Sequence, residues 1–122
     1  MKALIVDDSR FIRAHLRQIL EPIGIACSEA TNGCDALGVL AGPDSFDVML
    51  LDFNMPGMNG LDCLRSLRTS DRRDAMKVMM VTTEADNSFI DRALEYGADE
   101  FLMKPFTPES LREKFAMLGL AA

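Results

Sequence analysis

The sequence has few of the features that mark membrane or exported proteins. No apolar run approaches the roughly 18 residues that a membrane-spanning helix needs. The first apolar run covers only residues 3–6, and two acidic residues follow it directly, which does not match a secretory signal peptide. We therefore expect no insertion into a membrane.

Cysteine is scarce as well. The chain has three cysteines, Cys27, Cys34 and Cys63, and no two of them form a C-x-x-C pair. An odd number without such a pair argues against a disulfide framework and against a zinc site. We expect the three to be reduced, small apolar side chains of a cytoplasmic protein.

Positive charge is in deficit. Thirteen basic residues stand against nineteen acidic ones, which gives a net charge of -6. Proteins that bind nucleic acid by themselves usually carry the opposite sign, because neutralising phosphates dominates their affinity. We therefore expect no nucleic acid among the partners.

What the sequence does have is a regular alternation of short apolar runs and longer stretches of helical period. Its 122 residues suit one hydrophobic core, so we expect a single domain over residues 1–122. The apolar runs, which we interpret as strands, are residues 3–6, 25–28, 46–51, 78–81 and 101–103. The second run is the least hydrophobic and suits an edge position.

The stretches between these runs repeat apolar residues at three and four positions, as helices do. They cover residues 10–20, 34–40, 61–67, 87–96 and 111–118. Asn59 and Thr107 are suitable N-caps, Pro108 suits a first helical turn, and Gly97 suits a helix end. Five strands that alternate with five helices predict an α/β fold, a parallel sheet covered on both faces.

Chemically active residues follow four of the five predicted strands. In a parallel sheet of this kind, ligands bind outside the carboxyl ends of the strands. The residues at those ends are Asp7, Asp8, Asp52, Thr82 and Lys104. Each alone could be a solvated turn residue, but together they predict a site with three carboxylates, a hydroxyl and an ammonium.

Three neighbouring carboxylates raise one another's pKa unless a cation compensates their charge. Few protein ligands and several waters suit Mg²⁺ better than Ca²⁺. The remaining groups suit phosphoryl transfer, with Lys104 and Thr82 each meeting one phosphoryl oxygen. A carboxylate can itself act as the nucleophile and form an aspartyl phosphate.

Several motifs occur in order along the chain. They are Ile5-Val6-Asp7-Asp8-Ser9, the segment from Leu51-Asp52 through Met55-Pro56-Gly57 to Asn59-Gly60, Met80-Val81-Thr82-Thr83-Glu84-Ala85, Gly97-Ala98 and Lys104-Pro105-Phe106. With them the sequence resembles the receiver domains of two-component response regulators over essentially its whole length. It is most similar to the single-domain, CheY-like chemotaxis type. The resemblance implies a doubly wound, flavodoxin-like sheet with strand order 2-1-3-4-5 and five helices on its two faces.

The resemblance also assigns roles to individual residues. It implies that Asp52 is the phosphoacceptor and that Asp8, Asp52 and the backbone carbonyl of Asn54 bind Mg²⁺, with Mn²⁺ as a substitute. Asp7 would act through a metal-bound water. Thr82 and Lys104 would contact the phosphoryl group, and a cis peptide bond before Pro105 would aim Lys104 inward.

Two further positions concern the lifetime of the phosphorylated state. Asn54 and Glu84 can each order an attacking water by hydrogen bonding. We expect a short-lived phosphoryl group and self-dephosphorylation. The chain would then catalyse only its own phosphorylation and dephosphorylation, so we do not expect an enzyme that acts on other substrates.

The resemblance places the output on a surface formed by the fourth helix, the fifth strand and the fifth helix. Phe101 stands where chemotaxis members usually carry tyrosine, and it would change rotamer when the Thr82 hydroxyl moves. We expect the partner to contact Ile90, Phe101 and Lys114. Alternatively, Ile90 and Phe101 are ordinary core residues. A histidine kinase would be the phosphodonor. The target would be a downstream protein, such as a flagellar switch component, and the chain itself would be a monomer.

Other functions fit the sequence less well. The chain could be the receiver part of a larger regulator with a DNA-binding or catalytic output domain. A phosphohydrolase of the haloacid dehalogenase type would need an aspartate two residues after its nucleophile, where this chain has Asn54. A flavin or nucleotide binder would need a glycine-rich or hydroxyl-rich loop after the first strand. His15, the only histidine, is expected to be packed or solvated and not catalytic.

Overall fold

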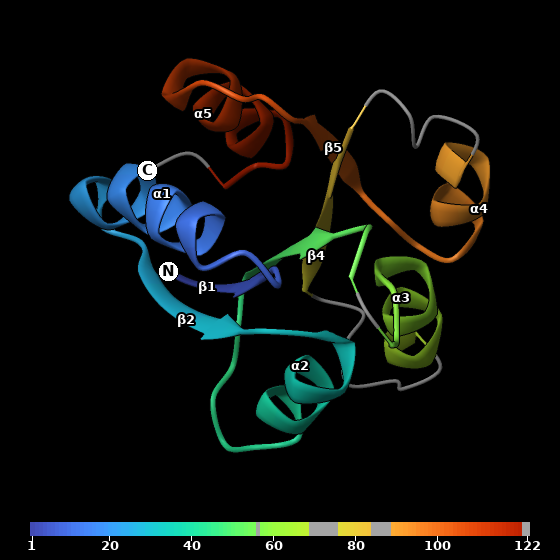
Figure 1. The fold of residues 1–122 in the computed structure, drawn as a ribbon. Helices are drawn as coiled ribbons and strands as arrows, with labels where there is room; N and C mark the ends of the chain where they lie inside the picture. Colours follow the sequence, from blue (N-terminus) through green and yellow to red (C-terminus); the bar gives the residue numbers. More distant parts are fainter. Residues whose placement is uncertain (56, 69–75, 84–88, 121–122) are drawn as a thin grey trace.

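The computed structural model describes residues 1–55, 57–68, 76–83 and 89–120 and shows one parallel five-stranded sheet (Figure 1). The strand order is β2-β1-β3-β4-β5, as the family resemblance implied. The strands are β1 (Lys2–Val6), β2 (Ala26–Ala30), β3 (Val48–Asp52), β4 (Lys77–Thr82) and β5 (Glu100–Met103). The least hydrophobic strand, β2, lies at an edge, as expected.

Helices cover both faces of the sheet. In Figure 1, α1 and α5 lie on one face and α2, α3 and α4 on the other. The helices are α1 (Arg10–Leu20), α2 (Gly33–Leu40), α3 (Gly60–Arg68), α4 (Ile90–Glu95) and α5 (Pro108–Met117), and a short 3₁₀ helix (Glu21–Ile23) follows α1. In the described part of the chain, no helix has the length and apolar character needed to cross a membrane.

The central strands are buried on both faces, so their residues alternate between two cores. Ile5 and Leu50 pack with Leu16 and Phe115 under α1 and α5. On the opposite face, Leu51 belongs to the core that α2, α3 and α4 cover. This double burial explains why β3 and β4 are continuous apolar runs and not alternating ones.

The predicted helix starts depend on side-chain caps that the structure contains. The Asn59 side chain accepts a hydrogen bond from the Asp62 N–H at the start of α3, at 2.9 Å. Thr107 and Ser110 form a reciprocal capping box at α5, with Pro108 in the first turn. These caps satisfy backbone N–H groups that have no partner within the helix.

Several predicted boundaries were wrong by a few residues. The strand predicted over residues 46–51 is Val48–Asp52, so Asp52 is its last residue and not the first after it. For the last helix, the apolar period alone covers residues 111–118 and leaves out the polar first turn, but the predicted N-cap Thr107 and first-turn Pro108 are confirmed, since the helix begins at Pro108. Helix α4 is shorter than the predicted 87–96: it is Ile90–Glu95, and residues 87 and 88 lie outside the described part.

Candidate functional site

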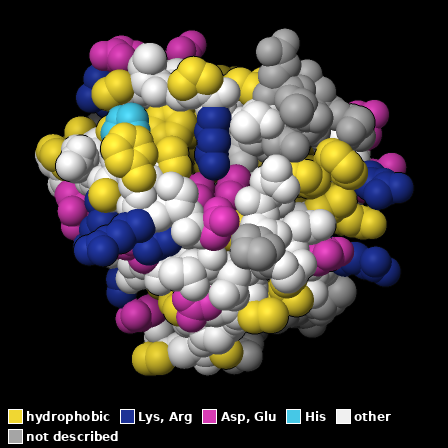
Figure 2. All heavy atoms as spheres, viewed as in Figure 1, with side chains coloured by type: hydrophobic (Ala, Val, Ile, Leu, Met, Phe, Trp, Pro, Cys, Tyr) yellow, Lys and Arg dark blue, Asp and Glu magenta, His cyan; other side chains and the backbone are white. Residues whose placement is uncertain are grey.

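Because all strands run in parallel, their carboxyl ends meet at one edge of the sheet, which we call the rim. Asp7 and Asp8 follow β1, Asp52 ends β3 and Thr82 ends β4. Lys104 follows β5, the edge strand next to β4. Figure 2, in the view of Figure 1, shows acidic side chains gathered at the centre of this face with a basic side chain beside them.

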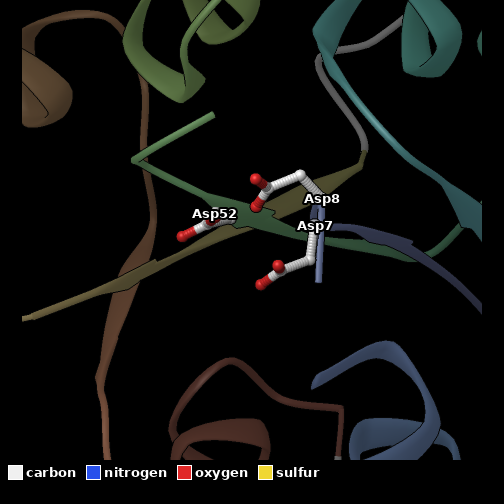
Figure 3. Close-up of side chains that lie close together, drawn as sticks. All are labelled: Asp7, Asp8 and Asp52. Carbon is white, nitrogen blue, oxygen red and sulfur yellow. The ribbon is translucent and has the colours of Figure 1, made fainter. Parts of the chain in front are cut away.

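The carboxylates of Asp7, Asp8 and Asp52 form a tight cluster. One oxygen from each lies within 4.8 Å of the other two. All three carboxylates point to the same side of the strand ends (Figure 3). Asp7 is 2% exposed and Asp52 4%, while Asp8 is open to solvent, so the cluster has a buried floor and one accessible ligand.

Lys104 joins the two buried carboxylates. Its Nζ lies 3.1 Å from Asp52 Oδ1 and 3.2 Å from Asp7 Oδ2. The Lys104 N–H donates to the Thr82 carbonyl at 2.7 Å, which ties the base of this side chain to the end of β4. The Lys104–Pro105 peptide bond is cis.

Burial and a neighbouring negative charge raise the pKa of Asp52. Desolvation is the main cause and the Asp7 carboxylate adds to it, so the pKa of Asp52 rises from 3.8 to about 6. The Lys104 ammonium and the N–H of Asn54 act in the opposite direction. Asp52 is therefore ionised at neutral pH, yet its carboxylate is poorly solvated.

The pKa of Lys104 is raised, which is the direction that its carboxylate partners favour. Burial by itself lowers the pKa of an ammonium, but the carboxylates of Asp52 and Asp7 outweigh burial and raise the pKa of Lys104. The ammonium therefore stays charged across the physiological range. One positive charge among three carboxylates leaves the cluster negative overall.

The donor set of this cluster fits a hard divalent cation. Carboxylate oxygens are the ligands that Mg²⁺ prefers, and an exposed Asp8 leaves room for the waters that it retains. Asp8 and Asp52 could bind such an ion directly. Asn54, exposed and two residues after Asp52, could add its backbone carbonyl.

Thr82 and Phe101 belong to an apolar crevice beside the cluster. The crevice has no room for a water molecule, and it is lined by Phe53, Met80, Thr82, Phe89, Ile90, Ala93 and Phe101. Thr82 is only 5% exposed. The crevice therefore links the rim to α4 and β5.

Sequence reasoning missed two parts of this region. The rings of Phe53 and Phe89 lie 4.6 Å apart at 33° and form one wall of the crevice. Gly60 lies so close to β3 that a Cβ there would collide with the Asp52 carbonyl oxygen. The Gly60 N–H also donates to the Phe53 carbonyl at 2.9 Å, which holds the loop after Asp52 against the strand.

The expected partner-facing residues lie on the predicted elements and are all half-buried. They are Ile90 on α4, Phe101 on β5 and Lys114 on α5, and Lys114 Nζ pairs with Glu100 Oε1 at 3.1 Å. The same three elements carry exposed apolar side chains that sequence reasoning did not single out, Leu94, Met103 and Met117. Such residues are hard to predict, because on a short helix the residue type does not distinguish an exposed apolar side chain from a buried one.

The other predicted positions are placed as follows. Glu84 lies outside the described residues. His15 stacks on the Phe106 ring with centroids 5.1 Å apart, which fits the expected packing role. Cys27, Cys34 and Cys63 are free thiols, as expected, and only Cys63 is buried, whereas Cys34 is exposed.

Comparisons with known proteins agree with this geometry. A family model for the response regulator receiver domain matches residues 3–116. The chemotaxis protein CheY of Pseudomonas aeruginosa is 40% identical over 115 residues, which is 93% of this chain and 92% of that protein. CheY1 of Helicobacter pylori is 35% identical over 119 residues, 97% of this chain and 96% of that protein.

A solved structure shows the same fold. The chemotaxis response regulator CheY4 of Vibrio cholerae superimposes with a TM-score of 0.89 at 32% identity. The match covers 96% of this chain and 97% of that one. The strand order and the rim therefore belong to an architecture that these relatives share.

Proposed function

The chain belongs to the response regulator receiver family, and from this premise we propose that it is a phosphorylation-activated switch whose phosphoacceptor is Asp52. Receiver domains are the signalling components of two-component systems, in which histidine kinases supply the phosphoryl group. The observation that carries the proposal is the position of Asp52: a buried carboxylate between two aspartates and an ammonium.

The proposed reaction is a nucleophilic displacement at phosphorus. A carboxylate oxygen of Asp52 forms a bond to the phosphorus of the donor, and the bond from phosphorus to the donor's histidine nitrogen breaks. The nitrogen leaves with the bonding electron pair. With a pKa of about 6, Asp52 is the free carboxylate at neutral pH, and desolvation leaves it less stabilised than an exposed aspartate.

The neighbouring groups stabilise the charge that moves onto the phosphoryl oxygens. Lys104, 3.1 Å from Asp52, can turn from the carboxylate to a phosphoryl oxygen without leaving the site. Thr82 offers a hydroxyl hydrogen to a second oxygen. A Mg²⁺ ion bound by Asp8, Asp52 and the Asn54 carbonyl would supply positive charge to the third oxygen, and Asp7 would orient one of its waters.

The phosphorylated state is proposed to decay by hydrolysis. Water attacks the phosphorus, the bond to the Asp52 oxygen breaks, and inorganic phosphate leaves while the carboxylate is regenerated. Asn54 and Glu84 are proposed to orient that water through their side chains. The double variant Asn54→Met with Glu84→Leu should then prolong the phosphorylated state, and an unchanged decay rate would remove these residues from the mechanism.

The output is proposed to be a change in the surface of α4, β5 and α5. When the Thr82 hydroxyl turns toward a phosphoryl oxygen, the packing of Thr82 in the crevice that it lines together with Phe101 changes. The ring of Phe101 then moves further inward and changes the outline of the face that also carries Ile90 and Lys114. Phosphate contacts favour one of two existing conformations, so this is a population shift.

The downstream process is proposed to be chemotaxis, in keeping with the names of the relatives from Pseudomonas aeruginosa and Helicobacter pylori. The partner would be a protein that docks on the α4–β5–α5 face. Chemical-shift perturbation with a candidate partner, in free and beryllofluoride-treated protein, tests that location. Shifts confined to α1 would contradict it.

The experiment that tests the proposal as a whole is intact-mass measurement after incubation with acetyl phosphate and Mg²⁺. The wild-type chain should gain the mass of one phosphoryl group, and the Asp52→Asn variant should gain none. Asp62→Asn is the matched control, because Asp62 is an exposed aspartate on α3. Equal labelling of the wild type and Asp52→Asn would overturn the assignment.

A further inference from the structure

We propose that Arg13 is a positioning residue that holds the Asp7–Asp8 peptide in the orientation needed for cation binding, and that Glu29 braces it. The inference rests on the proposed function, since it concerns the same acidic cluster. It assigns a role to α1 and β2, which carry none of the site residues discussed so far.

Arg13 joins three segments through one guanidinium group. Its Nη1 donates to the backbone carbonyl of Asp7 at 2.8 Å, and its Nε donates to Glu29 Oε1 at 2.7 Å. The Arg13 side chain is only 13% exposed. Because a guanidinium is planar and carries its donors in a rigid fork, these two bonds together fix its orientation.

The Asp7 carbonyl is a sensitive point of the site, because it belongs to the peptide that links Asp7 to Asp8. Rotation of that peptide would turn the carboxylate of Asp8 relative to that of Asp7. The Asp7 N–H donates to Ala30 on β2 at 3.1 Å, and the Asp7 side chain accepts from the Ser9 N–H at 2.8 Å. Both bonds hold Asp7 itself, whereas the bond from Arg13 holds the peptide that follows.

Glu29 supplies the fixed end of the brace. It lies on β2 in register with Ile5 of β1, next to the strand that ends at the cluster. Arg17 also donates to it, at 2.6 Å through Nη1. Hydrogen bonds from Arg17 and Arg13 lower the pKa of Glu29 against the effect of burial, so it remains charged at neutral pH.

The positive charge of Arg13 and its positioning role predict opposite effects on cation binding, so a binding experiment distinguishes them. As a nearby positive charge, Arg13 would repel a divalent cation, so its removal would strengthen cation binding. As a positioning residue, it keeps Asp8 directed at the cation, so its removal would weaken binding. Groups that orient metal ligands typically contribute about 10-fold or more in affinity.

The matched control is Arg17. It loses the same charge when changed to glutamine and contacts the same Glu29, but its other hydrogen bond runs to Glu21 and not to Asp7. We expect Arg13→Gln to bind Mg²⁺ alone about 10-fold more weakly than the wild type in a calorimetric titration. Arg17→Gln should bind as tightly as the wild type or slightly more tightly.

A second readout needs no cation. In metal-free protein, loss of the bond to the Asp7 carbonyl should shift the ¹³C resonance of that carbonyl and the amide resonance of Asp8. Arg17→Gln should leave both resonances in place. Arg13→Lys should give an intermediate shift, because one ammonium cannot reproduce the fork. Thermal unfolding of each variant shows whether the fold is intact, and Glu29→Gln tests the brace with Arg13 present.

The outcomes separate the two hypotheses. If Arg13→Gln binds Mg²⁺ as tightly as the wild type and its Asp7 carbonyl resonance does not move, the positioning role is wrong and the proposed function stands. If the folded wild-type chain binds no Mg²⁺ and takes up no phosphoryl group, the proposed function fails and this inference fails with it. Weaker binding in Arg13→Gln but not in Arg17→Gln supports the positioning role.

Discussion

The rim has two halves that are held together by different forces. In its acidic half, short polar contacts fix Asp7, Asp52 and Lys104, such as the 3.1 Å pair between Lys104 and Asp52, and Asp8 lies beside them. Its apolar half, the crevice around Thr82 and Phe101, is held by ring packing and close contact. Directional bonds define a geometry for chemistry, whereas packing without hydrogen bonds can rearrange at modest cost.

This difference suits a switch. A nucleophile needs its neighbours within a few tenths of an ångström, and polar contacts with defined distances provide that accuracy. An output surface must instead exist in two arrangements of similar free energy. Thr82 lies at the border between the halves, since it ends β4 at the rim and also lines the crevice.

Removing Lys104 should have the largest effect on the acidic half. Lys104→Met should slow phosphoryl uptake about 100-fold, as expected when one charged donor to a transferring group is lost. The pKa of Asp52 should rise above about 6, because Lys104 lowers it in the wild type. Uptake by mass spectrometry and a ¹³C titration of the Asp52 carboxyl measure the two effects.

Lys114→Met is the control for that variant. Lys114 also pairs with a glutamate at 3.1 Å, but it lies on α5 outside the acidic cluster. It should leave uptake and the Asp52 titration unchanged. Equal losses in the two variants would show that general charge, and not the contact with Asp52, is responsible.

The raised pKa of Asp52 predicts a stability that depends on pH. Because the folded protein binds this proton more tightly than the unfolded chain, ionisation of Asp52 lowers the free energy of unfolding as pH rises from about 4 to about 6. Without Mg²⁺ at pH 7.5, Asp52→Asn should therefore be more stable than the wild type by about 2–3 kcal/mol. The gain should shrink toward zero as pH falls to 4.

Urea unfolding of both proteins across this range measures the difference. Asp62→Asn, which changes an exposed carboxylate, should show no such trend. A stability difference for Asp52→Asn that is the same at pH 4 and pH 7.5 would contradict the raised pKa.

The apolar half should respond in stability and not in chemistry. Phe89→Ala removes one ring of the Phe53–Phe89 pair and should cost about 1–2 kcal/mol in the free energy of unfolding. Phosphoryl uptake should stay near the wild-type rate, because no polar contact of Asp52 changes. A large loss of uptake without a loss of stability would show that the two halves are not separable in this way.

The smallest effect is expected at the ion pair between Lys114 and Glu100. Lys114→Gln breaks the contact with Glu100. The Lys114 side chain is 32% exposed and the Glu100 side chain 16%. Pairs this accessible to solvent contribute about 0–1 kcal/mol, so the free energy of unfolding should change by less than about 1 kcal/mol. A larger change, measured by urea unfolding, would mean that this pair helps to hold β5 against α5.

Much of the fold could be predicted from local patterns. The helix over residues 10–20 was predicted with its observed bounds, because its apolar period is strong. The start of α5 was predicted from its capping residues and not from its apolar period, since the polar capping box around Thr107 carries no hydrophobic signal. The strand after residue 46 was predicted too early, because Phe46 is buried without being part of the sheet.

The candidate site shows the same division. Asp7, Asp52, Thr82 and Lys104 could be placed together because parallel strands end at one edge. The contact of Arg13 with the Asp7 carbonyl could not be predicted, because every residue has a backbone carbonyl and the residue type does not show which one accepts a hydrogen bond. The pairing of Phe53 with Phe89 also depends on how α4 packs on the sheet, which no local pattern encodes.

The most direct test of the central claim is to locate the phosphoryl group in the chain. Protein labelled with acetyl phosphate and Mg²⁺ is treated with borohydride, which reduces an aspartyl phosphate to homoserine, and its peptides are sequenced by mass spectrometry. If Asp52 is the phosphoacceptor, homoserine appears at position 52 in labelled protein and is absent there in unlabelled protein. Homoserine at position 7 or 8, with an intact aspartate at position 52, would contradict it.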